Sequence, residues 1–396
     1  MAEACLIGSL LVMIIIGLIA LYIRHHVIRM ILLTFICAFG IRGLTLLYVW
    51  NQYPQMASLC GMSILFYLGH MGHLLCIEGY QLAKTTKGNR FSKLIEAINV
   101  MSNGRHVGTK REIGGLIRQH VHCRELVLRF YPLRLDKPTR DYHRRNIRLA
   151  FIVNRIMIAA AIWMIYSGGK MLMMKSHLIG FTHIRPADFD SSKQPFLRRL
   201  SDVTAREVII RSGLVLYHNW NTWALCTFIH NIFAALNIML RLNAPHDWTY
   251  LFGNISEAYT VRRYWSRFWH RLSYRHHVDY AHRLGESLFR FRPSCILYGI
   301  WIKLFVFGLS GITHAVVVAN MGYQCGYMEE IWWYLLNFYA IVAEQVIGWL
   351  VGELIIIKSL NTMIKKTLGF IWVFLFMFWS LPKLYYSKMT LSCVPL

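Results

Sequence analysis

Two histidines stand in sequence contexts that could support proton transfer. His270 lies in YWSRFWHRLSYRHH (264–277), where tryptophan, arginine and histidine are crowded together in a largely apolar chain. His314 lies in FGLSGITHAVV (307–317), inside a hydrophobic stretch. An ionisable side chain within a membrane span is costly and usually marks function. The alternative for His314 is a structural histidine hydrogen-bonded to a neighbouring helix, and the pattern alone leaves both interpretations open.

The segment around His270 has two faces if residues 258–274 form one helix. Apolar and aromatic residues, among them Trp265 and Trp269, fall on one face, and the cationic residues fall on the other. Such a helix is typical of an interfacial anchor. The cationic face could instead bind a polyanion such as the phosphates of coenzyme A, with His270 near a bound thioester. Ser256 is a candidate N-cap.

Hydrophobic residues make up 56% of the 396 residues and charged residues only 16%, whereas a soluble domain has about 25% charged residues. The apolar residues form blocks of the length needed to cross a bilayer as helices. We therefore expect an all-α polytopic membrane protein with about eight transmembrane helices and amphipathic interfacial helices. The blocks occupy 5–23, 27–50, 57–79, 149–168, 208–240, 294–321, 331–357 and 367–386.

The whole chain, 1–396, is expected to form a single membrane domain. Residues 80–148 make a basic connection with amphipathic stretches (91–101 and 114–130), and 241–293 carries the basic–aromatic motif. The positive-inside rule places both segments in the cytosol and both termini in the lumen. The membrane is expected to be that of the endoplasmic reticulum. The first block is interpreted as a retained signal anchor. Residues 169–205 depart from this charge pattern.

The net charge of +24 is attributed to basic residues that flank spans and face anionic lipid, not to nucleic-acid binding.

The nine cysteines show no spacing that predicts a zinc site or a disulfide framework. His70 and His73 share a helix face, but the histidine boxes of a di-iron oxygenase are incomplete, so no metal is expected. The oligomeric state is left open.

Four further polar residues are candidates for substrate binding. Ser310 lies one helical turn before His314 and could hydrogen-bond to it. Glu344 lies in the middle of a span, where it needs a partner: a substrate hydroxyl, or a cation on another helix. Asn219 and His230 belong to YHNWNTWALCTFIHN (217–231), a span polar enough to line a chamber for an acyl acceptor or to hydrogen-bond to other helices.

The combination of LFGNISEAYTVRRYWSRFWHRL with GLSGITH one span later resembles the membrane-bound O-acyltransferases, in particular their wax-synthase-like subgroup. Trp265, Phe268, Trp269 and His270 match the family's first element, and Ser310, Gly311 and His314 match the second. Fungal members of this type acetylate hydroxyls of terpenoids and meroterpenoids. The resemblance covers residues 246–314 and implies an enzyme that uses acyl-CoA, with acetyl-CoA as the expected donor.

On this resemblance, His314 removes the proton of a hydrophobic alcohol while the oxygen attacks the thioester, without a covalent enzyme intermediate. His270 orients the donor or stabilises the oxyanion. The acyl-CoA site is expected to include Arg263, Arg267, Arg271, Trp265, Trp269 and Tyr274. Two alternatives stay open: a long-chain acyl-CoA:alcohol transferase, and a polytopic transporter or receptor without enzymatic activity.

Overall fold

The computed structural model describes residues 1–82, 90–103, 140–175, 185–290, 292, 295–351 and 361–389. Within these ranges the chain is all-helical, so the predicted fold class is confirmed. Seven helical segments are long and apolar enough to cross a membrane. They are α1 (Ala2–Tyr22), α2 (His26–Thr45) with η1 (Leu47–Trp50), α3 (Pro54–Gly72) with η2 (His73–Ile77), the 146–168 part of α7 (Arg140–Lys175), α8 (Ala205–Met239), α11 (Ile296–Asn320) and α14 (Thr362–Met389).

The predicted span 331–357 corresponds to α12 (Tyr327–Val351), which is not among the seven, and residues 352–357 lie outside the described part of the chain. It has the length of a span, 25 residues, but its middle carries Asn337 and Glu344. Other boundaries agree closely with the prediction. Helix α11 lies where the span 294–321 was predicted, and α8 lies where the span 208–240 was predicted. The segment 169–205 departs from the charge pattern of the other connections. Its part 185–203 contains three short 3-10 turns: η5 (Pro186–Phe189), η6 (Ser191–Lys193) and η7 (Phe196–Asp202).

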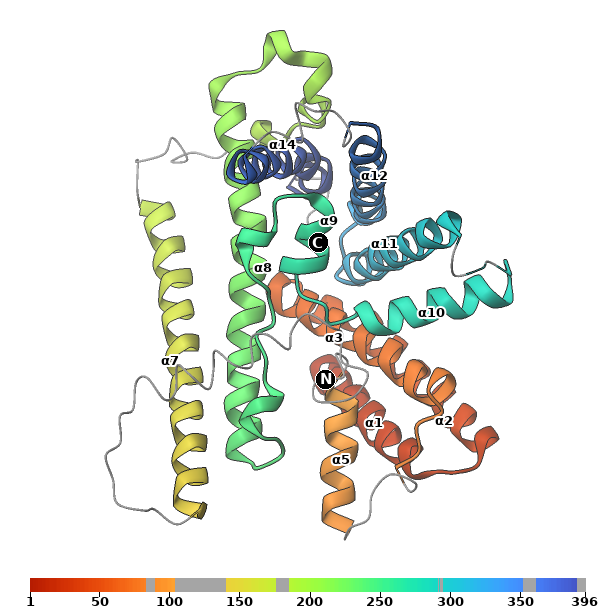
Figure 1. Ribbon diagram of the computed structural model, residues 1–396. Coiled ribbons are helices and arrows are strands. Elements are labelled where there is room, and N and C mark those ends of the chain that lie inside the picture. The colour runs from red at the N-terminus through yellow and green to blue at the C-terminus, as the bar shows by residue number, and fades with distance from the viewer. Residues whose placement is uncertain are drawn as a thin grey trace.

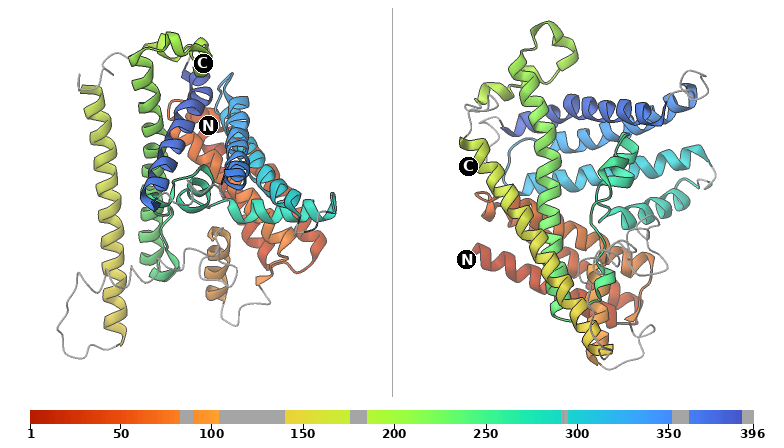
Figure 2. Two further views of the ribbon diagram at one scale, coloured as in Figure 1. Left: turned by 45° about the horizontal axis from the view of Figure 1, so that its top comes forward. Right: turned by 60° about the vertical axis from the view of Figure 1, so that its left-hand side comes forward.

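The long helices form three packed groups (Figures 1 and 2). Helices α1, α2 and α3 pack together, α7 runs alongside α8, and α11 packs along α12, with α14 contacting both α8 and α12. Small residues allow two helices to approach closely. At Gly311 of α11, the absence of a side chain lets the backbone of α12 come near. In Figure 1 the short helix α9 (Val261–Arg263) lies amid α8, α11, α12 and α14.

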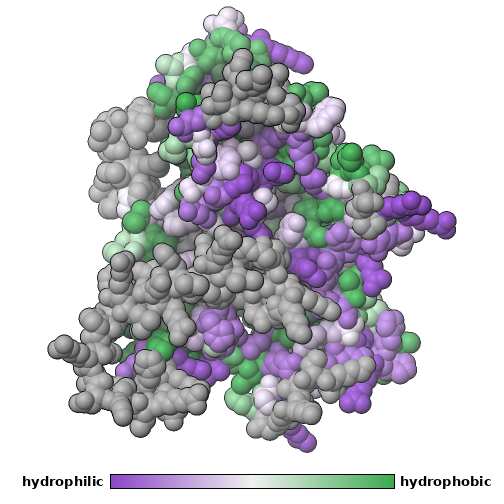
Figure 3. Space-filling view, in the orientation of Figure 1, coloured by the Kyte–Doolittle hydropathy of each residue, from purple (hydrophilic) through white to green (hydrophobic). Residues whose placement is uncertain are grey.

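One predicted cytosolic stretch is confirmed as a helix: residues 91–101 lie in the amphipathic helix α5 (Arg90–Ser102). The other stretch, 114–130, lies outside the described residues. On the surface, hydrophilic residues gather in the middle of the face drawn in Figure 3, where Figure 1 places α9. Apolar side chains are exposed along the spans, as expected for surfaces that face lipid, for example Trp163 and Met164 of α7.

The prediction of one continuous helix over 258–274 is wrong. After η9 (Ile255–Glu257), the helix begins at Val261, where the Thr260 hydroxyl, not Ser256, caps it by accepting from Arg263 N. A single π-helical turn follows, η10 (Tyr264–Phe268), closed by a hydrogen bond of 2.8 Å from Trp269 N to Tyr264 O. Trp269 is extended, and α10 (Tyr274–Ser287) starts afresh.

The physical reason for the break is burial. The π turn and the extended residue let Tyr264, Phe268 and Trp269 all enter the core, where each is at most 7% exposed. A regular α-helix places residues 264 and 269 about 140° apart around its axis, so it could not direct both side chains inward. The burial of the apolar face is therefore confirmed although the continuous helix is not.

Candidate active site

Glu344 of α12 anchors the motif-bearing segment to the helix bundle. Its carboxylate accepts hydrogen bonds from the backbone N–H of Val261 at 2.6 Å and of Arg262 at 3.0 Å. The indole of Trp372 donates a third hydrogen bond at 2.7 Å. A carboxylate at the first N–H groups of a helix satisfies donors that have no partner within the helix. The mid-span carboxylate thus holds the start of α9.

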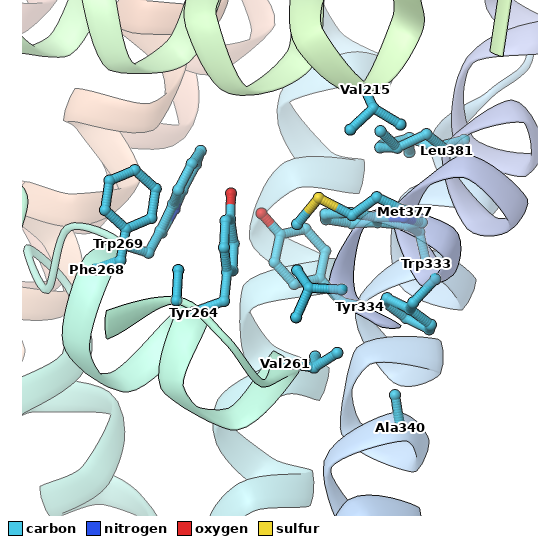
Figure 4. Packing of buried hydrophobic residues seen from close by; sticks show 14 of the residues in the cluster. Val215, Val261, Tyr264, Phe268, Trp269, Trp333, Tyr334, Ala340, Met377 and Leu381 are labelled. Carbon is cyan, nitrogen blue, oxygen red and sulfur yellow. The ribbon is translucent and has the colours of Figure 1, made fainter. Parts of the chain in front are cut away.

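Behind this anchor, the aromatic residues of the segment form a wall against α12 (Figure 4). Trp265 packs against Trp333 and Tyr334, with ring centroids 6.0 and 5.9 Å apart, and donates its indole N–H to Asn337 at 2.9 Å. Tyr264 packs beside Trp269 at 5.2 Å. These rings belong to one buried cluster that also includes Phe307 of α11 and Met377 of α14.

His314 faces this wall from α11. Its imidazole stacks on the ring of Tyr334 with centroids 4.9 Å apart. The helices approach closely one turn earlier, because a Cβ at Gly311 would lie only 2.9 Å from the Cα of Ile331. Ser310 donates its hydroxyl to Val306 O at 2.8 Å, so the expected hydrogen bond to His314 is replaced by one within the helix.

His270 follows the break after the π turn and is half-buried. Its ring lies 5.5 Å from that of Trp269 and edge-on to Phe252 at 5.6 Å. A continuous series of ring contacts leads from there to His314: Trp269 to Trp265 at 5.5 Å, Trp265 to Tyr334, and Tyr334 to His314. The structure thus connects the two predicted imidazoles through one aromatic cluster.

A third imidazole, His218 of α8, belongs to the same cluster. Its ring is parallel to that of Trp269, with 6.1 Å between the centroids, and lies edge-on to Trp333 at 5.3 Å. Its Nδ1 lies 2.8 Å from the hydroxyl oxygen of Tyr385. His218 is also close enough to His314 for their charges to interact. Sequence reasoning noted the polar stretch but assigned no role to this residue.

His277 of α10 is a fourth imidazole in this region. It is 6% exposed and close enough to His314 for their charges to interact. Burial lowers its pKa from 6.5 to about 4, so it is neutral at physiological pH. The sequence offers only a weak signal for this residue, the adjacent pair His276–His277.

The predicted cofactor-binding arginines differ in their surroundings. Arg263 forms an ion pair with Glu257 and lies over the ring of Tyr259 at 4.4 Å. Arg271 donates to the backbone oxygen of Ser266, and burial lowers its pKa. Arg267 is exposed. Tyr274, 42% exposed, begins α10, while Trp265 and Trp269 are turned into the core.

The predicted substrate-binding residues on α8 lie at two different places. Asn219 accepts a hydrogen bond of 2.8 Å from the Tyr264 hydroxyl, which points toward α8 in Figure 4, so it borders the aromatic cluster. His230 lies three turns further along α8, where Nε2 is 2.9 Å from Thr249 O and the ring contacts Trp248. The roles assigned to both residues, and to Ser310 and Glu344, stay predictions.

His70 and His73 have protein partners on their Nε2 atoms. His70 Nε2 lies 2.8 Å from Val100 O, and His73 Nε2 lies 2.7 Å from a carboxylate oxygen of Asp279. Among the described residues, no group of three or more histidine, cysteine, aspartate or glutamate side chains is arranged to hold a metal ion. The first contact joins α3 to α5, and the second joins η2 to α10.

Residues 248–339 match the model of the membrane bound O-acyl transferase family. This region contains both His270 and His314, so the predicted resemblance to that family is confirmed. The chain is similar to three curated fungal proteins: acetyltransferase aurG of Calcarisporium arbuscula (27% identity over 202 residues, 50% of this chain and 48% of that protein), acetyltransferase fsoF of Humicola fuscoatra (25% over 183 residues, 44% and 43%) and acetyltransferase ple2 of Rhodocybe pseudopiperita (30% over 158 residues, 38% and 40%).

The chain spans less than half the length of these curated relatives. No solved structure matches it.

Proposed function

We propose that this protein is a membrane-embedded O-acyltransferase that moves an acyl group from acyl-CoA to a hydroxyl of a hydrophobic small molecule. One observation carries the proposal: the region that matches the acyltransferase family contains both predicted histidines, and both contact one buried aromatic cluster. A transporter or receptor gives no reason for this arrangement.

In the proposed reaction, His314 takes the proton of the acceptor hydroxyl while its oxygen attacks the thioester carbonyl. The new acyl–oxygen bond forms, the acyl–sulfur bond breaks, and the proton passes to the departing coenzyme A thiolate. A positioned general base typically contributes about 10²–10⁴-fold to such a step. The His314 imidazole projects from α11 onto the ring of Tyr334. This apolar environment supports the role of a base, because it favours the neutral imidazole that a base requires.

His270 is proposed to contact the acyl-CoA thioester at the end of the motif-bearing segment. Its half-buried ring lies beside that of Trp269, and Arg267, three residues earlier in the chain, is exposed. Exposed Arg267 is available for a coenzyme A phosphate, while Arg263 reaches one only by exchanging its partner Glu257. The exposed side of this segment would then be the entrance for the donor.

We propose that this entrance faces the cytosol and that the membrane is that of the endoplasmic reticulum. The positive-inside rule supports this orientation, because the motif-bearing segment 241–293 is itself rich in arginine. In the turn between α11 and α12, Cys325 is disulfide-bonded, which suits an oxidising lumen, although the spacing of the cysteines predicted no disulfide framework.

The donor is proposed to be acetyl-CoA and the acceptor a terpenoid or meroterpenoid alcohol. The curated relatives are named acetyltransferases, which supports the acetyl donor. The acceptor class comes from the resemblance to fungal family members. A long-chain acyl-CoA is the second candidate donor, because the family resemblance includes wax-synthase-like proteins.

Membranes from a host that expresses the protein should transfer label from acetyl-CoA to at least one member of a panel of terpenoid alcohols. Mass spectrometry of the product should show a gain of one acetyl unit. Parallel reactions with palmitoyl-CoA identify a long-chain donor, and membranes from the empty host are the control. Absence of transfer from either donor to the whole panel, with the protein present in the membrane, would contradict the proposal.

A further inference from the structure

His218 combines deep burial with a nitrogen that lacks a partner. The residue is 9% exposed, and its Nε2 has no hydrogen-bond partner among the described residues. The other ring nitrogen, Nδ1, lies 2.8 Å from the Tyr385 hydroxyl oxygen. A buried polar atom without a partner destabilises the fold, so its presence at this position calls for an explanation.

The contact with Tyr385 determines which ring nitrogen carries the proton. Within the described residues, His218 Nδ1 is the hydrogen-bond partner of the Tyr385 hydroxyl. A phenol that is buried satisfies its own proton first, and donation to Nδ1 is the available route. Nδ1 is then the acceptor, so the proton of the neutral imidazole resides on Nε2. The unpartnered atom is therefore a hydrogen-bond donor.

This donor lies within the proposed active site. His218 stacks on Trp269, the neighbour of His270, and contacts Trp333, the neighbour of Tyr334, on which His314 stacks. The rings of the two predicted histidines and of His218 thus border the same aromatic wall from three different segments of the chain.

We propose that His218 donates a hydrogen bond from Nε2 to the carbonyl oxygen of the acyl thioester, and that Tyr385 is the positioning residue that fixes this tautomer. This inference rests on the proposed function. As the acceptor oxygen attacks the carbonyl carbon, the π electrons of the carbonyl group move onto the carbonyl oxygen. They re-form the double bond when the bond to sulfur breaks. The Nε2 proton stays on His218, while the acceptor's proton goes to His314 and then to coenzyme A.

A donor suits the carbonyl oxygen better than it suits the acceptor hydroxyl. The carbonyl oxygen gains negative charge in the transition state, so a fixed donor there lowers the barrier selectively. The acceptor oxygen loses its proton to His314 and becomes less negative as it attacks. The role proposed for His270, contact with the donor at the end of the motif-bearing segment, is separate from this one.

Three substitutions at His218 separate the proposed role from others. His218→Ala removes the donor and should lower kcat by about 10²–10³-fold with little change in the acceptor KM. His218→Gln places an amide N–H near the position of Nε2 and should stay within about tenfold of wild type. His218→Asn places its amide near Nδ1 instead, facing Tyr385, and should be as impaired as His218→Ala.

Tyr385→Phe tests the positioning role, because it removes the group that holds the tautomer but leaves the imidazole. We expect a lower kcat with an unchanged acceptor KM, and no further loss when Tyr385→Phe is added to His218→Ala. Thermal unfolding of each purified variant in detergent checks that the fold is retained.

An active wild type with an equally active His218→Ala variant would overturn the inference and leave the proposed function intact. A folded His218→Gln variant as inactive as His218→Ala would overturn the donor role, because an amide can donate but cannot act as a base. A wild type that acylates no acceptor would overturn the proposed function and this inference together.

Discussion

At the scale of single residues, the buried imidazole of His277 links stability to pH. Its pKa is about 4 in the folded protein and 6.5 when exposed, because burial disfavours the cation. The unfolded chain therefore binds more protons between these values, and stability falls as the pH drops from 6.5 to 4. The full difference is of the order of 3 kcal/mol. We expect a lower thermal unfolding temperature at pH 5 than at pH 7.

The control for this prediction is His277→Gln, which cannot titrate. Its unfolding temperature should change less between pH 7 and pH 5 than that of the wild type, measured in the same detergent. An identical pH dependence in both proteins would show that His277 does not contribute.

Candidate functional residues could be predicted from the sequence where a side chain is unusual for its surroundings. His314 was identifiable because it interrupts an apolar span, and His270 because it stands among tryptophans and arginines. His218 was not identifiable as a separate candidate. Its significance comes from Trp269 and Tyr385, which are remote in the sequence and come close only through packing.

At the scale of elements, Glu344 fixes the start of α9 by accepting two backbone N–H groups. Glu344→Ala leaves both donors without an acceptor and should reduce stability by about 1–3 kcal/mol. Glu344→Gln keeps one carbonyl oxygen and should lose less. Because α9 leads directly into the π turn, activity should decline in the same order.

Unfolding temperature and initial rate, measured side by side, check this order. Trp372→Phe is the matched control, since it removes only the third hydrogen bond to the carboxylate. If Glu344→Ala were as stable and as active as the wild type, the anchoring role would be excluded.

Close approach of α11 and α12 gives a second prediction at this scale. A methyl group at position 311 would lie 2.9 Å from Ile331 Cα and 3.1 Å from Tyr334 Cβ, which would force the helices apart. Gly311→Ala should therefore separate His314 from Tyr334 and lower kcat. Gly308→Ala is the matched control, because a Cβ there meets no atom within 4 Å. Equal rates for both variants would contradict the packing argument.

The limits of pattern reasoning are clearest in the segment 258–274. Hydrophobic periodicity correctly predicted its buried face, since Val261, Phe268 and Trp269 all lie in the core. It could not predict the π turn, which depends on where Trp333 and Tyr334 leave room for the rings. Likewise, the partner of Glu344 is a backbone N–H pair, which no side-chain pattern reveals.

At the scale of the whole molecule, span boundaries could be predicted because crossing a bilayer requires a certain length of apolar helix. As far as the structure describes them, all eight apolar blocks overlap helices, and seven of these helices are apolar enough to cross a membrane. The packing of these helices around α9 could not be predicted, because lipid-facing and core-facing apolar residues look alike in a sequence.

The proposed orientation predicts which side of the membrane each loop reaches. In sealed microsomes, a membrane-impermeant maleimide should label Ser266→Cys, an exposed position beside the donor entrance. Gln324→Cys, exposed in the turn between α11 and α12, should react only after the membrane is permeabilised. Labelling in excess of the wild-type cysteines is the quantity to measure, and the reverse pattern would invert the proposed topology.

The most direct test of the account is the rate of acyl transfer by His314→Ala under single-turnover conditions. If His314 is the general base, the rate should fall by about 10²–10⁴-fold. The control variant is His246→Ala, because the side chain of His246 is 76% exposed. This variant should transfer the acyl group at the wild-type rate. A folded His314→Ala variant that retains the wild-type rate would contradict the central claim.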